Sequence, residues 1–185
     1  MLFRSQWGVP VVIDNRGGAS GTLAVDAAAK AAPDGHTMVM GLIASITVAP
    51  SLHKLQYDPV TDLAPVSMLA VAQNILVVHP SVAAASVKEL IALAKAKPGQ
   101  LAYASAGNGT SPHLSAELFK LMAGVNLNHV PYKGAGPALI DLIAGQVQVY
   151  FGSLPATLPT VRAGKLRVLA ATDRKSTRLN SSHVS

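Results

Sequence analysis

The second half of the chain alternates short apolar runs with amphipathic segments. Helices are predicted where apolar residues recur every three or four positions, between Ser86 and Pro98, between Ser111 and Gly124, and over Pro137–Ala144. Strands are predicted over Asn74–Val78, Leu101–Ser105, Asn128–Val130, Val147–Phe151 and Leu166–Thr172. Strands that alternate with helices are typical of βαβ units, so the pattern predicts an α/β fold with a mainly parallel sheet.

Local signals mark the ends of two of these helices. Ser86-Val-Lys-Glu89 has the spacing of a capping box. Ser111 followed by Pro112 predicts an N-cap with proline in the first turn, and Gly124 ends that helix. The face of this helix that is predicted to be buried consists of Leu114, Leu118, Leu121 and Met122.

The first half of the chain has weaker signals. Strands are predicted over Val9–Asp14, Thr37–Gly41 and Val66–Leu69, where aliphatic residues cluster. A helix is predicted over Ser20–Ala31, and a short helical turn near Ser51–Leu55 follows a loop through Pro50.

The two ends of the chain break these patterns. The polar stretch from Asp173 to His183 has no apolar period and resembles the translation of a sequencing-library adapter, and Leu2-Phe-Arg-Ser5 resembles the matching adapter. We therefore expect residues 1–6 to be a non-native leader and residues 173–185 a non-native tail. Half of the formal net charge of +6 comes from these ends, through Arg4, Arg174, Lys175 and Arg178, less Asp173.

Composition narrows the classes of function. Half of the residues are hydrophobic and 13% are charged, which indicates a folded chain rather than a disordered one. The remaining basic residues are scattered and only 4% of residues are aromatic, which argues against nucleic-acid binding. The chain has no cysteine, which excludes disulfides, thiolate metal sites and a cysteine nucleophile. The uncharged stretch Leu63–Val87 is interrupted by prolines and predicts two strands rather than a membrane span.

Two glycine-rich segments each join a predicted strand to a predicted helix. Arg16–Gly21 lacks the glycine spacing of a dinucleotide fingerprint, so a tight turn is the better interpretation. Ala104–His113 has neither that spacing nor the Lys-Ser/Thr of a P-loop. It combines two glycines and a helix N-terminus with the polar residues Ser105, Asn108, Thr110 and Ser111. This combination favours a cradle for a small anion, and a loop that binds nothing stays open as the alternative.

Catalysis and metal binding have weaker support. Tyr103-Ala-Ser105-Ala-Gly107 is half of a nucleophile elbow and lacks its first glycine. No metal site is predicted, because the histidines of the chain show no short ligand spacing.

Six motifs occur in order along the chain. They are Val11-Val-Ile-Asp-Asn-Arg16-Gly-Gly-Ala, Lys30-Ala-Ala-Pro-Asp-Gly35-His-Thr, Tyr57-Asp-Pro-Val-Thr-Asp-Leu-Ala-Pro-Val66, Val77-Val-His-Pro80, Tyr103-Ala-Ser-Ala-Gly-Asn-Gly-Thr110-Ser-Pro-His-Leu and His129-Val-Pro-Tyr-Lys-Gly134. Together they resemble the substrate-binding proteins of tripartite tricarboxylate transporters, also called the Bug family of periplasmic solute receptors.

The resemblance implies a type II periplasmic-binding-protein fold, in which two α/β domains close on a small carboxylate without a cofactor. The expected divisions are an incomplete first domain over residues 7–71, a second domain over residues 72–164 and a crossover strand over residues 165–172. The residues that the resemblance assigns to the ligand are Ser105, Gly107, Asn108, Gly109, Thr110 and His113 in an anion-holding loop, Phe151 and Gly152 at the next strand end, and Ser45 in the first domain. Gly152 stands where family members often carry an acidic residue, which argues against an amino-acid ligand.

The resulting hypothesis is a periplasmic receptor, not an enzyme, that delivers its carboxylate to the permease subunits of a transporter. We expect it to be a monomer at full length, with its signal peptide lost by truncation. Two alternatives stay open: an α/β serine hydrolase that uses Ser105, and a structural remnant without a competent site.

Overall fold

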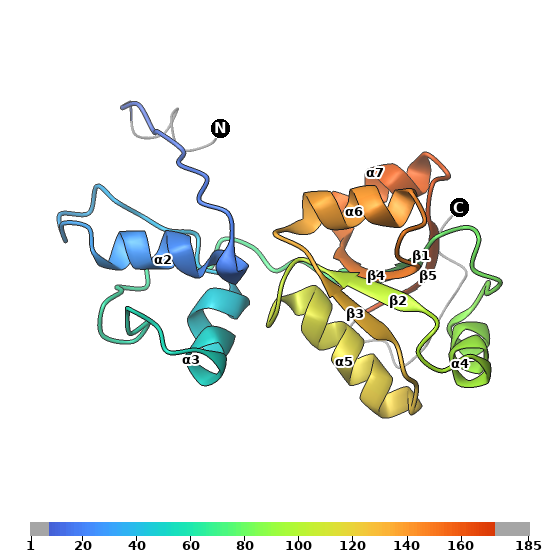
Figure 1. Ribbon diagram of the computed structural model, residues 1–185. Helices are drawn as coiled ribbons and strands as arrows, with labels where there is room; N and C mark the ends of the chain where they lie inside the picture. The colour runs from blue at the N-terminus through green and yellow to red at the C-terminus, as the bar shows by residue number, and fades with distance from the viewer. Residues whose placement is uncertain (1–7, 173–185) are drawn as a thin grey trace.

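The computed structural model describes residues 8–172, which form two lobes joined by an extended linker (Figure 1). Within these residues, the first lobe (residues 8–62) contains short helices, and the second lobe (residues 74–172) contains a five-stranded sheet with helices on both faces. The leader and tail expected at residues 1–6 and 173–185 lie outside the described residues.

The sheet has the strand order β3-β2-β4-β1-β5. Its strands are β1 (Asn74–Val78), β2 (Ala102–Ser105), β3 (Asn128–Pro131), β4 (Val149–Ser153) and β5 (Arg167–Ala171). β2 is parallel to β3 and β4, whereas β1 is antiparallel to β4 and β5. Four strands therefore point the same way and β1 runs against them. The predicted α/β fold is confirmed, with this one reversed strand between β4 and β5.

The central strands are buried on both faces. The helices that cover the sheet are α4 (Val87–Ala96), α5 (Ser111–Ala123), α6 (Ala135–Ile143) and α7 (Leu154–Arg162). From β1, Leu76 and Val78 pack in the core beneath α4 and α5, while Ile75 and Val77 pack in the core beneath α6 and α7. Because both faces need apolar side chains, β1 is a continuous aliphatic run rather than an alternating one.

The predicted capping box at the start of α4 is confirmed. The Ser86 hydroxyl accepts a hydrogen bond from the Glu89 backbone N–H at 3.2 Å. In return, the Glu89 carboxylate accepts one from the Ala85 backbone N–H at 2.8 Å. These contacts satisfy amide groups that would otherwise have no partner inside the helix.

The prediction of the buried face of α5 is wrong. Leu118, Leu121 and Met122 are 56%, 80% and 80% exposed, and Leu114 is also exposed. The residues that pack against the sheet are Ala116, Phe119 and Ala123. Apolar residues lie on both faces of this helix, so periodicity identified an apolar face but not the one that the sheet covers. The N-cap is Thr110 rather than the predicted Ser111.

The predicted strands of the first lobe are also wrong. Its elements are η1 (Ala19–Gly21), α2 (Thr22–Ala29), η2 (Ala44–Val48) and α3 (Ala49–Leu52), so the predicted helix over Ser20–Ala31 is found and the expected loop through Pro50 is helical. The segments predicted as strands run through the described part of the chain without a strand beside them to accept their backbone hydrogen bonds. Their side chains remain open to solvent, with Val12 88%, Met40 73% and Val66 85% exposed.

The linker enters the sheet beside the end of β5. The Thr172 backbone N–H and hydroxyl donate hydrogen bonds to the Asn74 carbonyl oxygen at 2.8 and 2.9 Å. Asn74 also donates through Nδ2 to the hydroxyls of Ser111 and Ser115 on α5, at 2.5 and 3.2 Å. The start of β1 therefore holds both the last described strand and the first turn of α5.

Removing the α4 cap is expected to destabilise the second lobe. Ser86→Ala should lower the free energy of unfolding by about 1 kcal/mol, because the Glu89 amide loses its acceptor. Ser86→Asn is the matched control, since it keeps a capping oxygen and should stay close to the original stability. Chemical denaturation measures both, and equal stability of Ser86→Ala and the unchanged protein would contradict the role of the cap.

Candidate functional site

The segment between β2 and α5 is held in one conformation by its own side chains. We call residues 105–110 the glycine loop. The Ser105 hydroxyl accepts a hydrogen bond from the Gly107 N–H at 3.2 Å, and the Thr110 hydroxyl donates to the Gly107 carbonyl at 2.6 Å. The Gly109 N–H donates to Nδ1 of His113 at 3.1 Å. The glycine loop thus has a fixed shape at the end of the second lobe that faces the first lobe (Figure 1).

Both glycines of the glycine loop are required by their surroundings. Gly107 and Gly109 have φ values of 127° and 74°, which side-chain-bearing residues rarely adopt. A Cβ at Gly107 would lie 2.8 Å from Oγ of Ser20, and one at Gly109 would lie 2.9 Å from Cγ1 of Val48. Their missing side chains therefore allow the backbone of the second lobe to approach the first.

Ser20 makes the direct contact between the lobes, and it is a residue that the sequence did not single out. Its hydroxyl donates to the Asn108 carbonyl at 2.7 Å. Ala19 and Ser20 have φ values of 45° and 55°, a strained region for residues other than glycine. Strain of this kind persists where tertiary contacts enforce it. The sequence signal that could have indicated Ser20 is the glycine-rich stretch Arg16–Gly21, which leads directly into a predicted helix, as the glycine loop does.

Three aromatic rings stack behind the glycine loop. The His129 ring on β3 lies between the Tyr103 ring on β2 and the His113 ring on α5, at centroid distances of 4.7 and 4.4 Å. His129 also contacts the Ser105 hydroxyl through Nε2 at 2.7 Å. Tyr103 continues the chain of contacts by donating to the Glu117 carboxylate at 2.5 Å, and Lys120 binds the same carboxylate oxygen at 2.8 Å.

Burial shifts the ionisation of these groups. It lowers the pKa values of both His113 and His129, and the His113 charge adds to the effect on His129. Burial alone would raise the pKa of Glu117, but hydrogen bonds from Lys120 and Tyr103 hold that pKa below its usual value. Burial and the neighbouring Glu117 raise the pKa of the Tyr103 hydroxyl. The cluster therefore favours neutral imidazoles beside an ionised carboxylate.

The contact between Ser105 and His129 has the length of a catalytic dyad but lacks its setting. Ser105 is fully buried, and its hydroxyl is already engaged with Gly107. A nucleophile must reach its substrate, and its histidine is normally oriented by a third group. Among the described residues, the hydrogen bond recorded for the His129 ring is the one to Ser105, and no carboxylate is bonded to it. The geometry is that of a side chain that shapes the glycine loop.

The other predicted site residues lie apart from the glycine loop. Ser45 is 1% exposed in the first lobe, where its Oγ lies 3.6 Å from the position of a Cβ on Gly21, directly behind η1. Phe151 is 4% exposed and packs against Phe119 in the core. Gly152 is buried, and a Cβ there would overlap Oγ1 of Thr157 and lie 2.5 Å from Cε1 of Tyr150. Their contact with a ligand stays a prediction.

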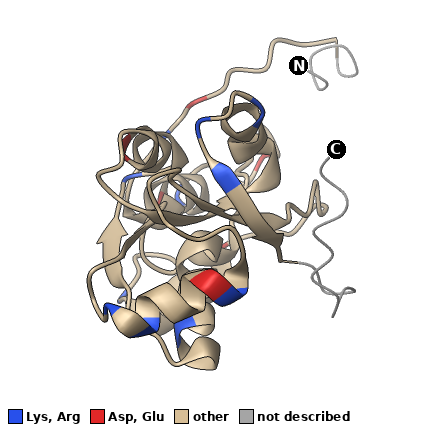
Figure 2. Ribbon diagram, turned by 90° about the vertical axis from the view of Figure 1, so that its right-hand side faces the viewer, with Lys and Arg blue, Asp and Glu red and all other residues tan. Residues whose placement is uncertain are grey.

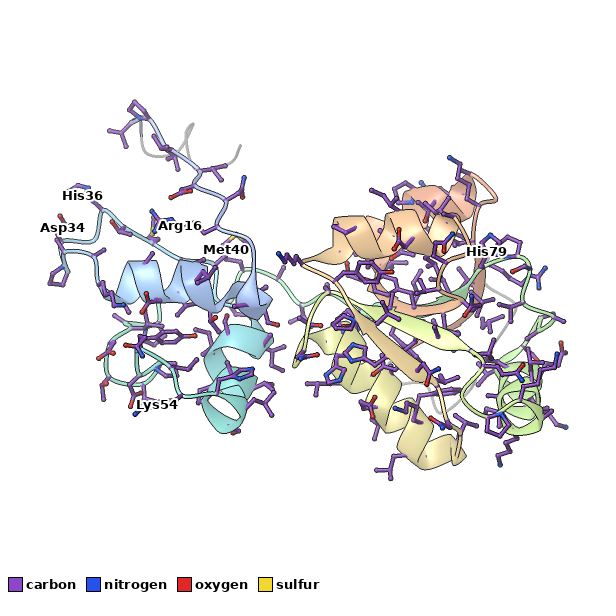
Figure 3. All side chains as sticks on the ribbon, in the orientation of Figure 1. Arg16, Asp34, His36, Met40, Lys54 and His79 are labelled. Atoms are coloured by element: carbon purple, nitrogen blue, oxygen red, sulfur yellow. The ribbon has the colours of Figure 1, made fainter. Side chains whose placement is uncertain are left out.

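Charged and metal-binding side chains do not gather elsewhere in the part of the chain that the structure describes. Figure 3 shows His36 at the outer end of the first lobe and His79 in the second lobe. Among residues 8–172, no group of three or more His, Asp or Glu side chains could hold a metal ion. Figure 2 shows Lys and Arg at scattered positions along the ribbon rather than in a stripe.

A hollow of about 680 Å³ lies in the first lobe, away from the glycine loop, and is lined by residues that include Pro50, His53 and Tyr57. Its walls are mostly apolar and it is open to solvent.

Comparisons with known proteins give a consistent result. A family model described as "Tripartite tricarboxylate transporter family receptor" matches residues 2–183. The curated protein BugT of Bordetella pertussis is 41% identical over 168 residues, which cover 88% of this chain and 51% of that protein. Among solved structures, R. palustris Rpa4515 with adipate has a TM-score of 0.88 at 40% identity, and covers 93% of this chain and 58% of that one. MatC from Rhodopseudomonas palustris with bound malate has a TM-score of 0.85 at 31% identity, and the match covers 92% of this chain and 58% of that one.

The chain spans about half the length of the curated relatives it matches. Within residues 8–172, the helices are too short or too polar to serve as membrane spans.

The absence of a side chain at position 152 is expected to be structurally required. Gly152→Ala should lower the free energy of unfolding by about 1–3 kcal/mol, because its methyl group would overlap Thr157 and press on Tyr150. The matched control is Gly136→Ala in α6, where nothing lies within 4 Å of the new Cβ. That change should be neutral or stabilising by up to about 1 kcal/mol. Chemical denaturation measures the free energy of unfolding of the two variants, and an equal change in both would contradict the packing argument.

The two half-buried histidines, His113 and His129, are expected to make stability depend on pH. Histidine in the unfolded chain titrates near 6.5, and the folded pKa values of His113 and His129 are lower. The unfolded chain therefore binds protons first, so the stability from the neutral rings is complete above about pH 6.5 and is lost as pH falls through the folded pKa values.

Thermal melts between pH 7.5 and 5.5 measure this dependence. The double variant His113→Asn with His129→Gln should show a smaller loss on acidification than the unchanged protein. His36→Asn, at an exposed site in the first lobe, should keep the original pH dependence. An unchanged slope in the double variant would refute the assignment.

Proposed function

Because the chain belongs to the tripartite tricarboxylate transporter receptor family, we propose that this protein is a periplasmic receptor that captures a small carboxylate and delivers it to a membrane permease. It acts by binding and release, not by catalysis. The ligands of its solved neighbours, adipate and malate, indicate the class of anion.

The observation that carries the proposal is the uncapped N-terminus of α5. Thr110 occupies the N-cap position, but its hydroxyl donates to Gly107 and makes no capping bond to the helix. Pro112 has no backbone N–H, so the donors of the first helical turn that stay available to an external acceptor are the N–H groups of Ser111 and His113. They follow the glycine loop directly, near the contact that the loop makes with Ser20. Asn108 is exposed at the same place.

The magnitudes are sufficient for a receptor. A partly buried helix N-terminus contributes up to about 2 kcal/mol toward an anion. Each charge-assisted hydrogen bond adds about 1.5–3 kcal/mol, and micromolar affinity requires about 8 kcal/mol. Two amide contacts to one carboxylate group reach about 8 kcal/mol together with the helix N-terminus when each bond lies at the upper end of its range.

The packing at Gly152 supports a ligand without an amino group. An ammonium group needs an acidic partner, and position 152 has no room for any side chain. Position 152 therefore supplies no acidic partner, which favours a di- or tricarboxylate over an amino acid as the ligand.

Isothermal titration of the full-length protein against linear di- and tricarboxylates, with amino acids as controls, tests the proposal. We expect a dissociation constant in the micromolar range for at least one carboxylate. Absence of binding across the panel would refute the receptor function and favour a structural remnant. Labelling of Ser105 by a fluorophosphonate probe would instead favour the hydrolase.

A pair of glycine variants tests whether the glycine loop is the site. Gly109→Ala should weaken carboxylate binding at least about 10-fold, because its methyl group would press on Val48 and hold the lobes apart. Gly124→Ala is the matched control at the other end of α5, since Gly124 also has a positive φ, of 60°, but nothing within 4 Å of its Cβ position. Both changes strain the backbone, and only the first should alter affinity. Equal affinities would show that the ligand binds elsewhere.

A further inference from the structure

The glycine loop is anchored at both ends by histidines. At its start, Ser105 contacts Nε2 of His129 at 2.7 Å while its hydroxyl accepts the Gly107 N–H. At its end, Gly109 donates its N–H to Nδ1 of His113. The two imidazole rings stack on each other at 4.4 Å, so the anchors form one unit although they come from β3 and α5.

The anchor at Gly109 needs a neutral ring. An imidazole accepts a hydrogen bond only through an unprotonated nitrogen, and a protonated imidazole has two donors and no acceptor. Protonation of His113 would therefore remove the acceptor of the Gly109 N–H and leave two donors facing each other.

We propose that His113 and His129 are positioning residues whose neutral rings hold the glycine loop in its anion-binding conformation, so that acidification releases the loop and weakens carboxylate binding. The effect on carboxylate binding rests on the proposed function. The effect of the histidines on the conformation of the glycine loop does not. It assigns His113 a place behind the binding surface instead of direct contact with the carboxylate.

The expected direction opposes simple electrostatics. A protonated histidine beside a carboxylate would strengthen binding by charge attraction, whereas here protonation breaks the support of the loop. Among the described residues, the ionisable groups that face the pair are Glu117 and Lys120 on α5 and Tyr103 on β2. Burial has the largest effect and lowers the pKa values of both rings. The Glu117 carboxylate raises these pKa values, and the Lys120 ammonium group lowers them.

Amide hydrogen exchange of the ligand-free, full-length protein tests the conformational part. The Gly109 N–H should be protected at pH 7.5 and should lose at least about 10-fold of its protection, beyond the intrinsic pH effect, as the His113 ring titrates in the NMR spectrum. His113→Asn keeps an acceptor oxygen near the position of Nδ1 and cannot be protonated, so protection should not change with pH. His113→Phe keeps the ring stack without the acceptor, and should leave Gly109 unprotected at every pH. Unaltered protection in His113→Phe, or in the unchanged protein once His113 is protonated, would overturn the proposal.

Titration with adipate or malate at pH 7.5 and 5.0 tests the link to binding. The dissociation constant of the unchanged protein should rise up to about 10-fold for each pH unit below the pKa of His113. His113→Asn corrects for protonation of the ligand itself and should show a smaller rise. Affinity that increases on acidification relative to His113→Asn would refute the positioning role. Absence of binding at either pH would refute the receptor function, and hydrogen exchange at Gly109 would still decide the role of the histidines.

Discussion

The close approach of two backbones is the constraint on which this site depends. Ser20 in the first lobe reaches the Asn108 carbonyl in the second, which is possible only because positions 107 and 109 carry no side chain. The left-handed conformation of Ala19 and Ser20 is the strain that accompanies this contact. A receptor that closes on a small anion needs such an arrangement, because short polar contacts from both sides must reach one molecule.

The side chains around the glycine loop stabilise its conformation and do not cap the start of α5. Ser105, Thr110 and His113 each bond to a glycine of the loop. The sequence predicts a ligand role for these three residues, and the hydrogen bonds that the structure shows for them lie within the loop and its supports. Backbone donors at the uncapped start of α5 can then serve an anion without rearrangement, which reduces the conformational entropy lost on binding.

Much of the second lobe was predictable because its signals are local. The capping box at Ser86 and the aliphatic run of β1 need only near neighbours in the sequence, and both are found. The first lobe was predicted less well, because a strand depends on a partner that the sequence pattern does not supply, and Val9–Asp14 has none beside it in the described residues. The apolar face of α5 was assigned to the wrong side for a related reason: the helix has apolar residues on two faces, and the sheet covers Ala116 and Phe119 rather than Leu118.

The sequence by itself determined the α/β fold, the family and the position of the glycine-rich turn between β2 and α5, because each of these is carried by residues close together in the chain or by motifs in a fixed order. Only the tertiary structure decided which residues support that loop. Ser20 is separated from Asn108 by 88 positions and His129 from Ser105 by 24. Contacts of this length arise from the packing of whole strands and helices, so no local pattern records them.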